Sequence, residues 1–113
     1  METPRTYPDL VVTPSNQAKE SYPESGLTRR VLAYNDKLFL AEHEMVKGWA
    51  GAMHSHPHDQ VVYIVRGHLK VNCLGKTFEL RIGGHFCCPR RRATRCLGNG
   101  GFAGNRCLHA VQR

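Results

Sequence analysis

Short apolar-rich stretches separated by turn residues dominate the chain from Thr28 onward. They predict strands over residues 30–34, 37–46, 61–66, 68–73, 77–80 and 85–88, and a strand or strand-like loop over 52–58. No window shows the sustained 3.6-residue apolar period of an amphipathic helix. Many short strands with turn signals about every 8–12 residues are typical of an all-β sandwich or barrel.

The first 27 residues have a different texture, because they are rich in proline, serine, threonine and charge. We expect residues 1–27 to form an extended N-terminal segment, in which Leu10-Val11-Val12 offers an additional edge strand. Residues 28–113 then form one small domain, because 113 residues are enough for a single hydrophobic core.

Charge is unevenly distributed along the chain. The net charge is +7, but residues 1–86 carry only +1, whereas residues 87–113 hold six arginines and no acidic residue. This distribution argues against a nucleic-acid-binding face built into the folded domain. No apolar run approaches the roughly 20 residues of a membrane span, and the first ten residues do not look like a secretory signal. We therefore expect a cytoplasmic protein that binds neither membrane nor nucleic acid.

Five cysteines are present, four of them in residues 87–113. An odd number without a secretory signal favours reduced thiols over a disulfide framework. Cys96, Cys107 and His109 suggest a zinc cluster, but their spacing matches no paired zinc pattern.

The stretch from Gly48 to Gly67 carries the candidate chemistry. Side chains two residues apart on a strand point to the same face, so His54 and His56 can direct two imidazoles at one metal ion. Gln60 follows and supplies an amide oxygen. Two imidazoles and an oxygen suit a divalent first-row metal with open positions. A histidine-rich surface loop without metal is the alternative interpretation.

The framing glycines favour the metal interpretation. Gly48, His54, His56, Gln60 and Gly67 have the spacing of the first cupin motif, G(X)5HXH(X)3–4E(X)6G, with glutamine in place of the usual glutamate. The sequence thus resembles the cupins, which implies a jelly-roll β-barrel with His54, His56 and Gln60 as metal ligands.

Residues 28–89 resemble more narrowly the small single-domain cupins of the KdgF type, in which HSHPH, an acidic residue and glutamine are usual. That resemblance implies a homodimer with a divalent metal such as Ni, Zn, Fe or Mn. It also implies conversion of 4,5-unsaturated uronates, released by pectin or alginate lyases, to the linear 4-deoxy-5-keto-uronate. The substrate would then be a small sugar acid.

The resemblance weakens at the second cupin motif, whose histidine is the fourth metal ligand in the family. Gly83 and Pro89 align with that motif, but Thr94 stands at the histidine position. The D-V-F-x-P-x-R pattern that ends KdgF-type chains is also missing. A missing ligand predicts a weakened site, unless His85 or His109 replaces it.

A shift of reading frame would explain the atypical tail from 87 to 113. With suitable codons, Cys-Cys-Pro-Arg-Arg-Arg-Ala-Thr read one nucleotide forward becomes Val-Val-Pro-Gly-Gly-Val-Gln-His, which contains the second motif. We hypothesise an out-of-frame reading of a cupin gene from about Cys87, with a lost terminal strand; the alternative is a divergent native tail. Sequencing the source DNA tests this.

Two other functions remain open. One is a non-catalytic sugar-binding or scaffold cupin with a weak or empty metal site, and the other is a small metal-dependent dioxygenase. The catalytic residues are not assigned by the sequence.

Overall fold

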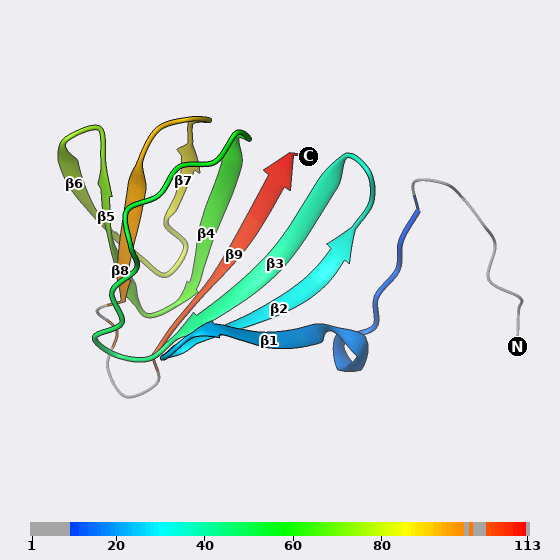
Figure 1. The fold of residues 1–113 in the computed structure, drawn as a ribbon. Helices are drawn as coiled ribbons and strands as arrows, with labels where there is room; N and C mark the ends of the chain where they lie inside the picture. The colour runs from blue at the N-terminus through cyan, green and yellow to red at the C-terminus, as the bar shows by residue number, and fades with distance from the viewer. Residues whose placement is uncertain (1–9, 99, 101–103, 113) are drawn as a thin grey trace, which may run out of the picture.

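The nine strands of the protein follow one another along the chain with only one short 3-10 helix among the described residues, as seen in the computed structural model (Figure 1). The structure describes residues 10–98, 100 and 104–112. The elements are η1 (Ser15–Gln17), β1 (Lys19–Glu24), β2 (Leu27–Tyr34), β3 (Leu38–Met45), β4 (Gln60–Arg66), β5 (His68–Cys73), β6 (Lys76–Arg81), β7 (His85–Cys88), β8 (Thr94–Gly98) and β9 (Asn105–Gln112). The all-β expectation is confirmed.

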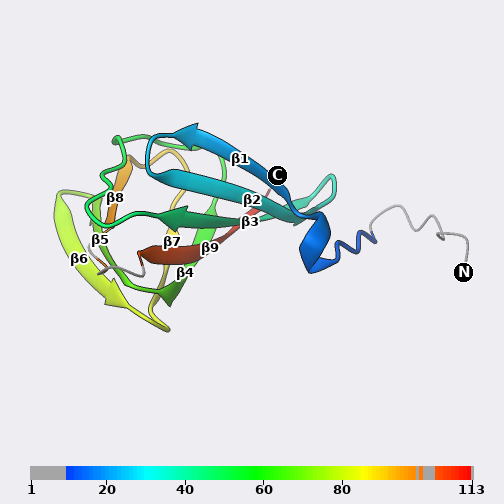
Figure 2. The same cartoon turned by 90° about the horizontal axis from the view of Figure 1, so that it is seen from below.

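Two antiparallel sheets face each other. The larger has the order β1-β2-β3-β9-β4-β7, and the smaller has the order β6-β5-β8. Seen from below, the small sheet closes one side of the barrel while β1 to β3 extend along the other (Figure 2). None of the described residues forms a helix long and apolar enough to cross a membrane.

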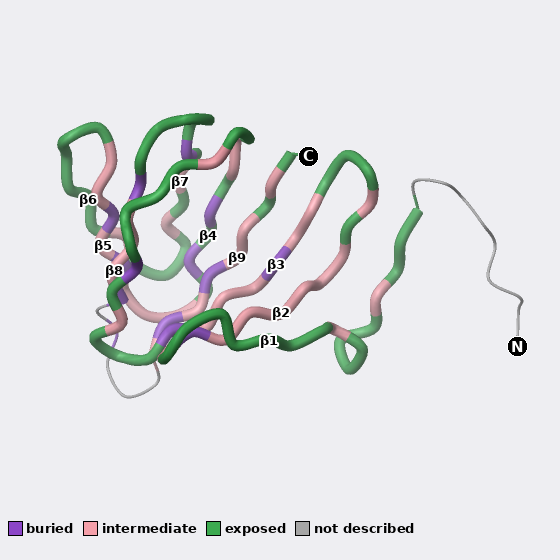
Figure 3. Tube along the Cα trace, viewed as in Figure 1, coloured by how far each residue is buried: buried purple, intermediate pink, exposed green. Residues whose placement is uncertain are grey.

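Alternation along paired strands decides which side chains point inward. Leu27, Met45, Val62, Ile64 and Cys107 come from four strands of the large sheet and form one buried cluster with Leu69 of the small sheet. The buried segments lie on strands of both sheets, whereas β1 and most connecting loops are exposed (Figure 3). Burying a large aliphatic side chain stabilises the fold by about 1.5–3 kcal/mol, so this cluster holds the two sheets together.

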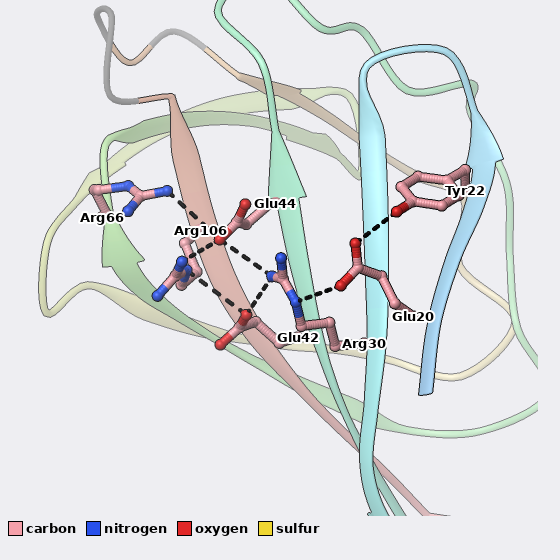
Figure 4. A network of polar contacts seen from close by, with 7 residues as sticks. All are labelled: Glu20, Tyr22, Arg30, Glu42, Glu44, Arg66 and Arg106. Atoms are coloured by element: carbon pink, nitrogen blue, oxygen red, sulfur yellow. Dashed lines mark hydrogen bonds and ion pairs between the residues drawn. The ribbon is translucent and has the colours of Figure 1, made fainter. Parts of the chain in front are cut away.

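The outer face of the large sheet carries a network of charges instead (Figure 4). Arg30 on β2 bonds Glu42 on β3 at 2.8 Å and Glu20 on β1 at 3.3 Å. Arg106 on β9 bonds Glu44 on β3, and Arg66 on β4 lies 3.7 Å from the same carboxylate. Cross-strand pairs of opposite charge therefore connect five neighbouring strands.

The expected loss of the terminal strand is wrong. β9 lies in the middle of the large sheet and pairs with β3 over its whole length and with β4. Its inward residues Cys107 and His109 alternate with the outward Arg106 and Leu108, which is the period that a half-buried strand requires. The hypothesis of a shifted reading frame stays a prediction.

The N-terminal segment also differs from expectation in one detail. Leu10-Val11-Val12 lies outside every strand, and the edge strand is β1, which pairs with β2. β1 is exposed along its whole length, so its sequence lacks the apolar alternation that would predict a strand.

Candidate metal centre

A long connection between β3 and β4 positions the two histidines of the first motif. Its backbone crosses to the small sheet and bonds β8: the N–H of Gly51 donates to Cys96 O at 2.9 Å, and His54 and Thr94 exchange two bonds of 3.1 and 2.8 Å. Residues 52–58, predicted as a strand or strand-like loop, form a loop, because they make only an isolated bridge and no continuous strand pairing. Two isolated bridges, at Ala50 and His54, therefore join this connection to β8.

Close packing against Asn105 requires glycine at the last position of the motif, Gly67. Gly67 lies at φ +89, and a Cβ there would stand 2.4 Å from Asn105 Oδ1. A residue with a side chain at this turn would be strained and would displace Asn105.

The three predicted ligands lie together. His54, His56 and Gln60 line one cavity of about 450 Å³ between the two sheets. The rings of His54 and His56 meet edge to face, with centroids 4.6 Å apart. Whether the three coordinate a metal remains a prediction.

The surroundings of His54 and Gln60 fit that role. His54 Nδ1 lies 2.9 Å from Ala52 O, so this nitrogen donates its proton and leaves Nε2 with a free lone pair. Gln60 Nε2 lies 3.0 Å from His109 Nδ1. With the amide nitrogen facing His109, the amide oxygen of Gln60 is left to bind a cation.

Thr94 cannot replace the missing histidine as a nitrogen donor, although it pairs directly with His54. Its side chain is buried, and its hydroxyl lies 2.9 Å from Cys88 Sγ and 3.4 Å from Cys73 Sγ. Of the two proposed substitutes, His85 is exposed and stacks on Tyr63, whereas His109 lines the cavity. Of the two, only His109 lines the cavity, and the lone pair of its Nδ1 already accepts from Gln60 Nε2.

Burial favours the neutral form of three of the imidazoles that line the cavity. Burial, with a smaller effect from Arg29, lowers the pKa of His43 to about 4. Burial also lowers the pKa of His109 well below its usual range and, less strongly, that of His56. A neutral imidazole is the form that binds metal. Arg29, which lines the same cavity, therefore supplies positive charge there at neutral pH.

Two residues of the cavity were not predicted from the sequence. Arg29 and His43 face inward from β2 and β3, and Arg29 Nε donates to His43 Nε2 at 3.0 Å. Since charged Glu42 and Glu44 flank His43, strict alternation would have placed His43 inward. No comparable signal exists for Arg29, because an inward arginine looks like a surface residue in a sequence.

Neighbouring histidine and aromatic residues differ in whether they reach the cavity. His58 is exposed and does not line the cavity. Tyr63 is exposed, whereas Trp49 lines the cavity and donates through its indole N–H to Glu24 Oε1 at 2.6 Å. Arg90 bonds Asp59 and so fastens the loop that precedes β8.

Comparison with known proteins places this geometry among cupins. No protein-family model matches the chain, and no curated protein matches it in sequence. Solved structures do match: KdgF from Halomonas sp. has a TM-score of 0.82 at 20% identity, covering 90% of this chain and 94% of that one. An RmlC-like cupin from Shewanella frigidimarina NCIMB 400 has a TM-score of 0.83 at 24% identity, covering 94% of each chain.

A more distant similarity is to a mutant of salicylate 1,2-dioxygenase from Pseudoaminobacter salicylatoxidans, solved in complex with gentisate. Its TM-score is 0.73 at 14% identity, over 79% of this chain and 26% of that one. The protein therefore has the cupin fold, a jelly roll of two antiparallel sheets. KdgF is among the cupins that it resembles in structure.

Proposed function

We propose that the protein is a metal-dependent cupin that converts 4,5-unsaturated uronates to linear 4-deoxy-5-keto-uronate. The observation that carries this proposal is the grouping of His54, His56 and Gln60 in one cavity with the guanidinium of Arg29. The structural similarity to KdgF supports the same substrate class. We further propose that the protein acts as a homodimer in the cytoplasm.

The charges of the cavity suit a sugar acid. Arginine pairs with carboxylates through two parallel hydrogen bonds, so Arg29 would hold the uronate carboxylate. A metal held by His54, His56 and Gln60 would supply a Lewis acid toward the sugar oxygens.

The reaction itself is an isomerisation and needs no co-reactant. The anomeric hydroxyl loses a proton, the bond between C1 and the ring oxygen breaks, and C4 gains a proton as the enol becomes a ketone. His43 and His109 are neutral imidazoles in the same cavity, in position to take part in this proton transfer.

The test is incubation of purified protein with lyase-generated unsaturated uronate, following the loss of its absorbance. We expect turnover that a chelator abolishes and that added divalent metal restores. In His54→Ala and in His56→Ala, turnover should fall at least about 100-fold. His85→Ala is the matched control, because His85 is an exposed histidine outside the cavity. Equal turnover in all three variants would contradict the proposal.

A non-catalytic cupin is the second candidate, and Thr94 favours it. Its hydroxyl faces cysteine sulfurs, so the fourth ligand of the second motif is absent at that position. This candidate predicts sugar-acid binding without turnover, measurable by calorimetry with the same substrate. A dioxygenase, the third candidate, would consume oxygen in a Clark-electrode assay.

A further inference from the structure

A second group of donor atoms lies deeper between the sheets, on β3 and β9. His43 pairs directly with Cys107, and His109 stands two residues further along β9, on the same face. Cys107 Sγ lies 3.2 Å from His109 Nε2, and the rings of His43 and His109 have centroids 4.1 Å apart. One donor atom from each of the three residues lies within 4.8 Å of the other two.

We propose that His43, Cys107 and His109 form a binding site for a thiophilic metal ion, of which Cu⁺ fits best. A cysteine thiolate is a soft donor and imidazole a borderline one, and together they favour copper or zinc over magnesium, calcium or manganese. His54, His56 and Gln60 are not among its ligands, but Gln60 contacts His109, and His43 and His109 are the imidazoles proposed above for proton transfer. Copper binding is therefore measured separately from turnover.

Burial and charge decide between copper and zinc. Cys107 is only 2% exposed, and Arg29 already brings one positive charge to His43. Cu⁺ replaces the thiol proton, so the S–H bond breaks, an S–Cu bond forms and the proton leaves to solvent with no change of oxidation state. The resulting pair is neutral, whereas Zn²⁺ would leave a net positive charge beside Arg29, which is costly in a buried site.

Arg29 competes with the metal for His43. A neutral imidazole has one lone pair, and Arg29 Nε–H occupies that of Nε2. Coordination by His43 therefore requires this hydrogen bond to break. It follows that removing Arg29 should strengthen metal binding, an effect that a purely structural role for the three residues would not produce. Coordination by His109 through Nε2 requires its proton to move to Nδ1, which now accepts from Gln60 Nε2.

The test is anaerobic titration of reduced, metal-free protein with Cu⁺ in competition with the coloured chelator bicinchoninate. We expect the wild-type protein to withdraw one equivalent of copper, and equimolar Zn²⁺ not to displace it. Cys107→Ser and His109→Ala should each weaken binding at least about tenfold, and Arg29→Met should tighten it.

Matched controls separate this site from other thiols and from the first motif. Cys87→Ser changes an exposed cysteine and His85→Ala an exposed histidine, so both should bind copper like the wild type. His54→Ala should also bind like the wild type, whatever its activity on uronate. Circular dichroism and urea unfolding establish that each metal-free variant is folded.

Three results would overturn the proposal. The first is that folded Cys107→Ser binds copper as tightly as the wild type. The second is that copper binding is lost in Cys88→Ser or Cys96→Ser and not in Cys107→Ser, and the third is that equimolar Zn²⁺ displaces the copper. If Cys107→Ser does not fold, X-ray absorption spectroscopy of copper bound to the wild-type protein identifies the ligands. Scattering from imidazole and one sulfur would support the site, and scattering from sulfur alone would contradict it.

Discussion

The side chain of Asn105 joins three separate parts of the chain. It is completely buried, and its Oδ1 accepts hydrogen bonds from the backbone N–H of His68 at 3.0 Å and of Gly100 at 2.7 Å. Its Nδ2 donates to Met45 O at 3.3 Å. One amide thus satisfies backbone groups at the end of β3 and the start of β5 while it begins β9.

Replacing this amide should destabilise the fold strongly. In Asn105→Ala two backbone N–H groups lose their acceptor, and each buried donor left without a partner costs about 1–3 kcal/mol. We expect the free energy of unfolding to fall by about 2–4 kcal/mol, measured by urea denaturation of metal-free protein.

Asn72→Ala is the control for that experiment. Asn72 accepts one exposed hydrogen bond from Thr77, so its loss should cost no more than about 1 kcal/mol. Similar denaturation midpoints for the two variants would refute the role assigned to Asn105.

Strand β9 depends on charge pairing as well as on its backbone bonds. Arg106 lies between Glu42 and Glu44, with its side chain about one-third exposed. Arg106→Glu replaces these attractions by repulsion and should cost about 1–2 kcal/mol of unfolding free energy, less at high salt. Arg92→Glu, in an exposed loop, should change stability by under about 0.5 kcal/mol. Equal effects at the two arginines would show that β9 gains nothing from the network.

The sequence predicted those strands that alternate strongly. Strands β2 to β7 were expected within a few residues of their observed bounds, because apolar and polar residues alternate along them and glycines mark the turns between β4, β5 and β6. β1, β8 and β9 were not expected. β1 is a polar edge strand held by pairing with β2, and β9 is a strand of arginine, cysteine, histidine and small residues whose position is set by long-range pairing with β3 and β4.

The candidate site was predicted only where its residues are close in sequence. His54, His56 and Gln60 lie within seven positions, and their spacing revealed them. Arg29 and His43 reach the same cavity from β2 and β3. His109, which the sequence offered only as a possible substitute ligand, reaches it from β9. Their meeting depends on the register of β2, β3 and β9, which local patterns do not contain.

The interior as a whole is built for neutral histidines, which makes its stability sensitive to acid. His43 has a pKa of about 4 in the folded protein against about 6.5 in an unfolded chain, and the pKa of His109 is lowered in the same direction. Between these values the unfolded state binds more protons, so stability is full above about pH 6.5 and falls as the pH drops toward 4. His43 alone accounts for at most about 3 kcal/mol of this loss.

Denaturation of metal-free protein at about pH 7.5 and about pH 4.5 measures this dependence. His43→Asn, which cannot take up a proton, should lose less stability on acidification than the wild type. His85→Asn should behave like the wild type, because His85 is exposed. Since protonation of carboxylates affects all three proteins alike, an unchanged acid dependence in His43→Asn would contradict the assignment.

The central place of β9 has a consequence for how the protein is made. Of the nine strands, β9 is synthesised last, yet it separates β3 from β4 in the large sheet. Until residues 105–112 emerge, the flank formed by β1 to β3 and the part that contains β4 to β8 have no shared sheet to join them. The large sheet can therefore form only after residues 105–112 have emerged. That step draws together segments from distant parts of the chain, and such steps make β-proteins slow to fold. During that interval the edges of β3 and β4 are open to other chains, and chaperones would have most to protect there.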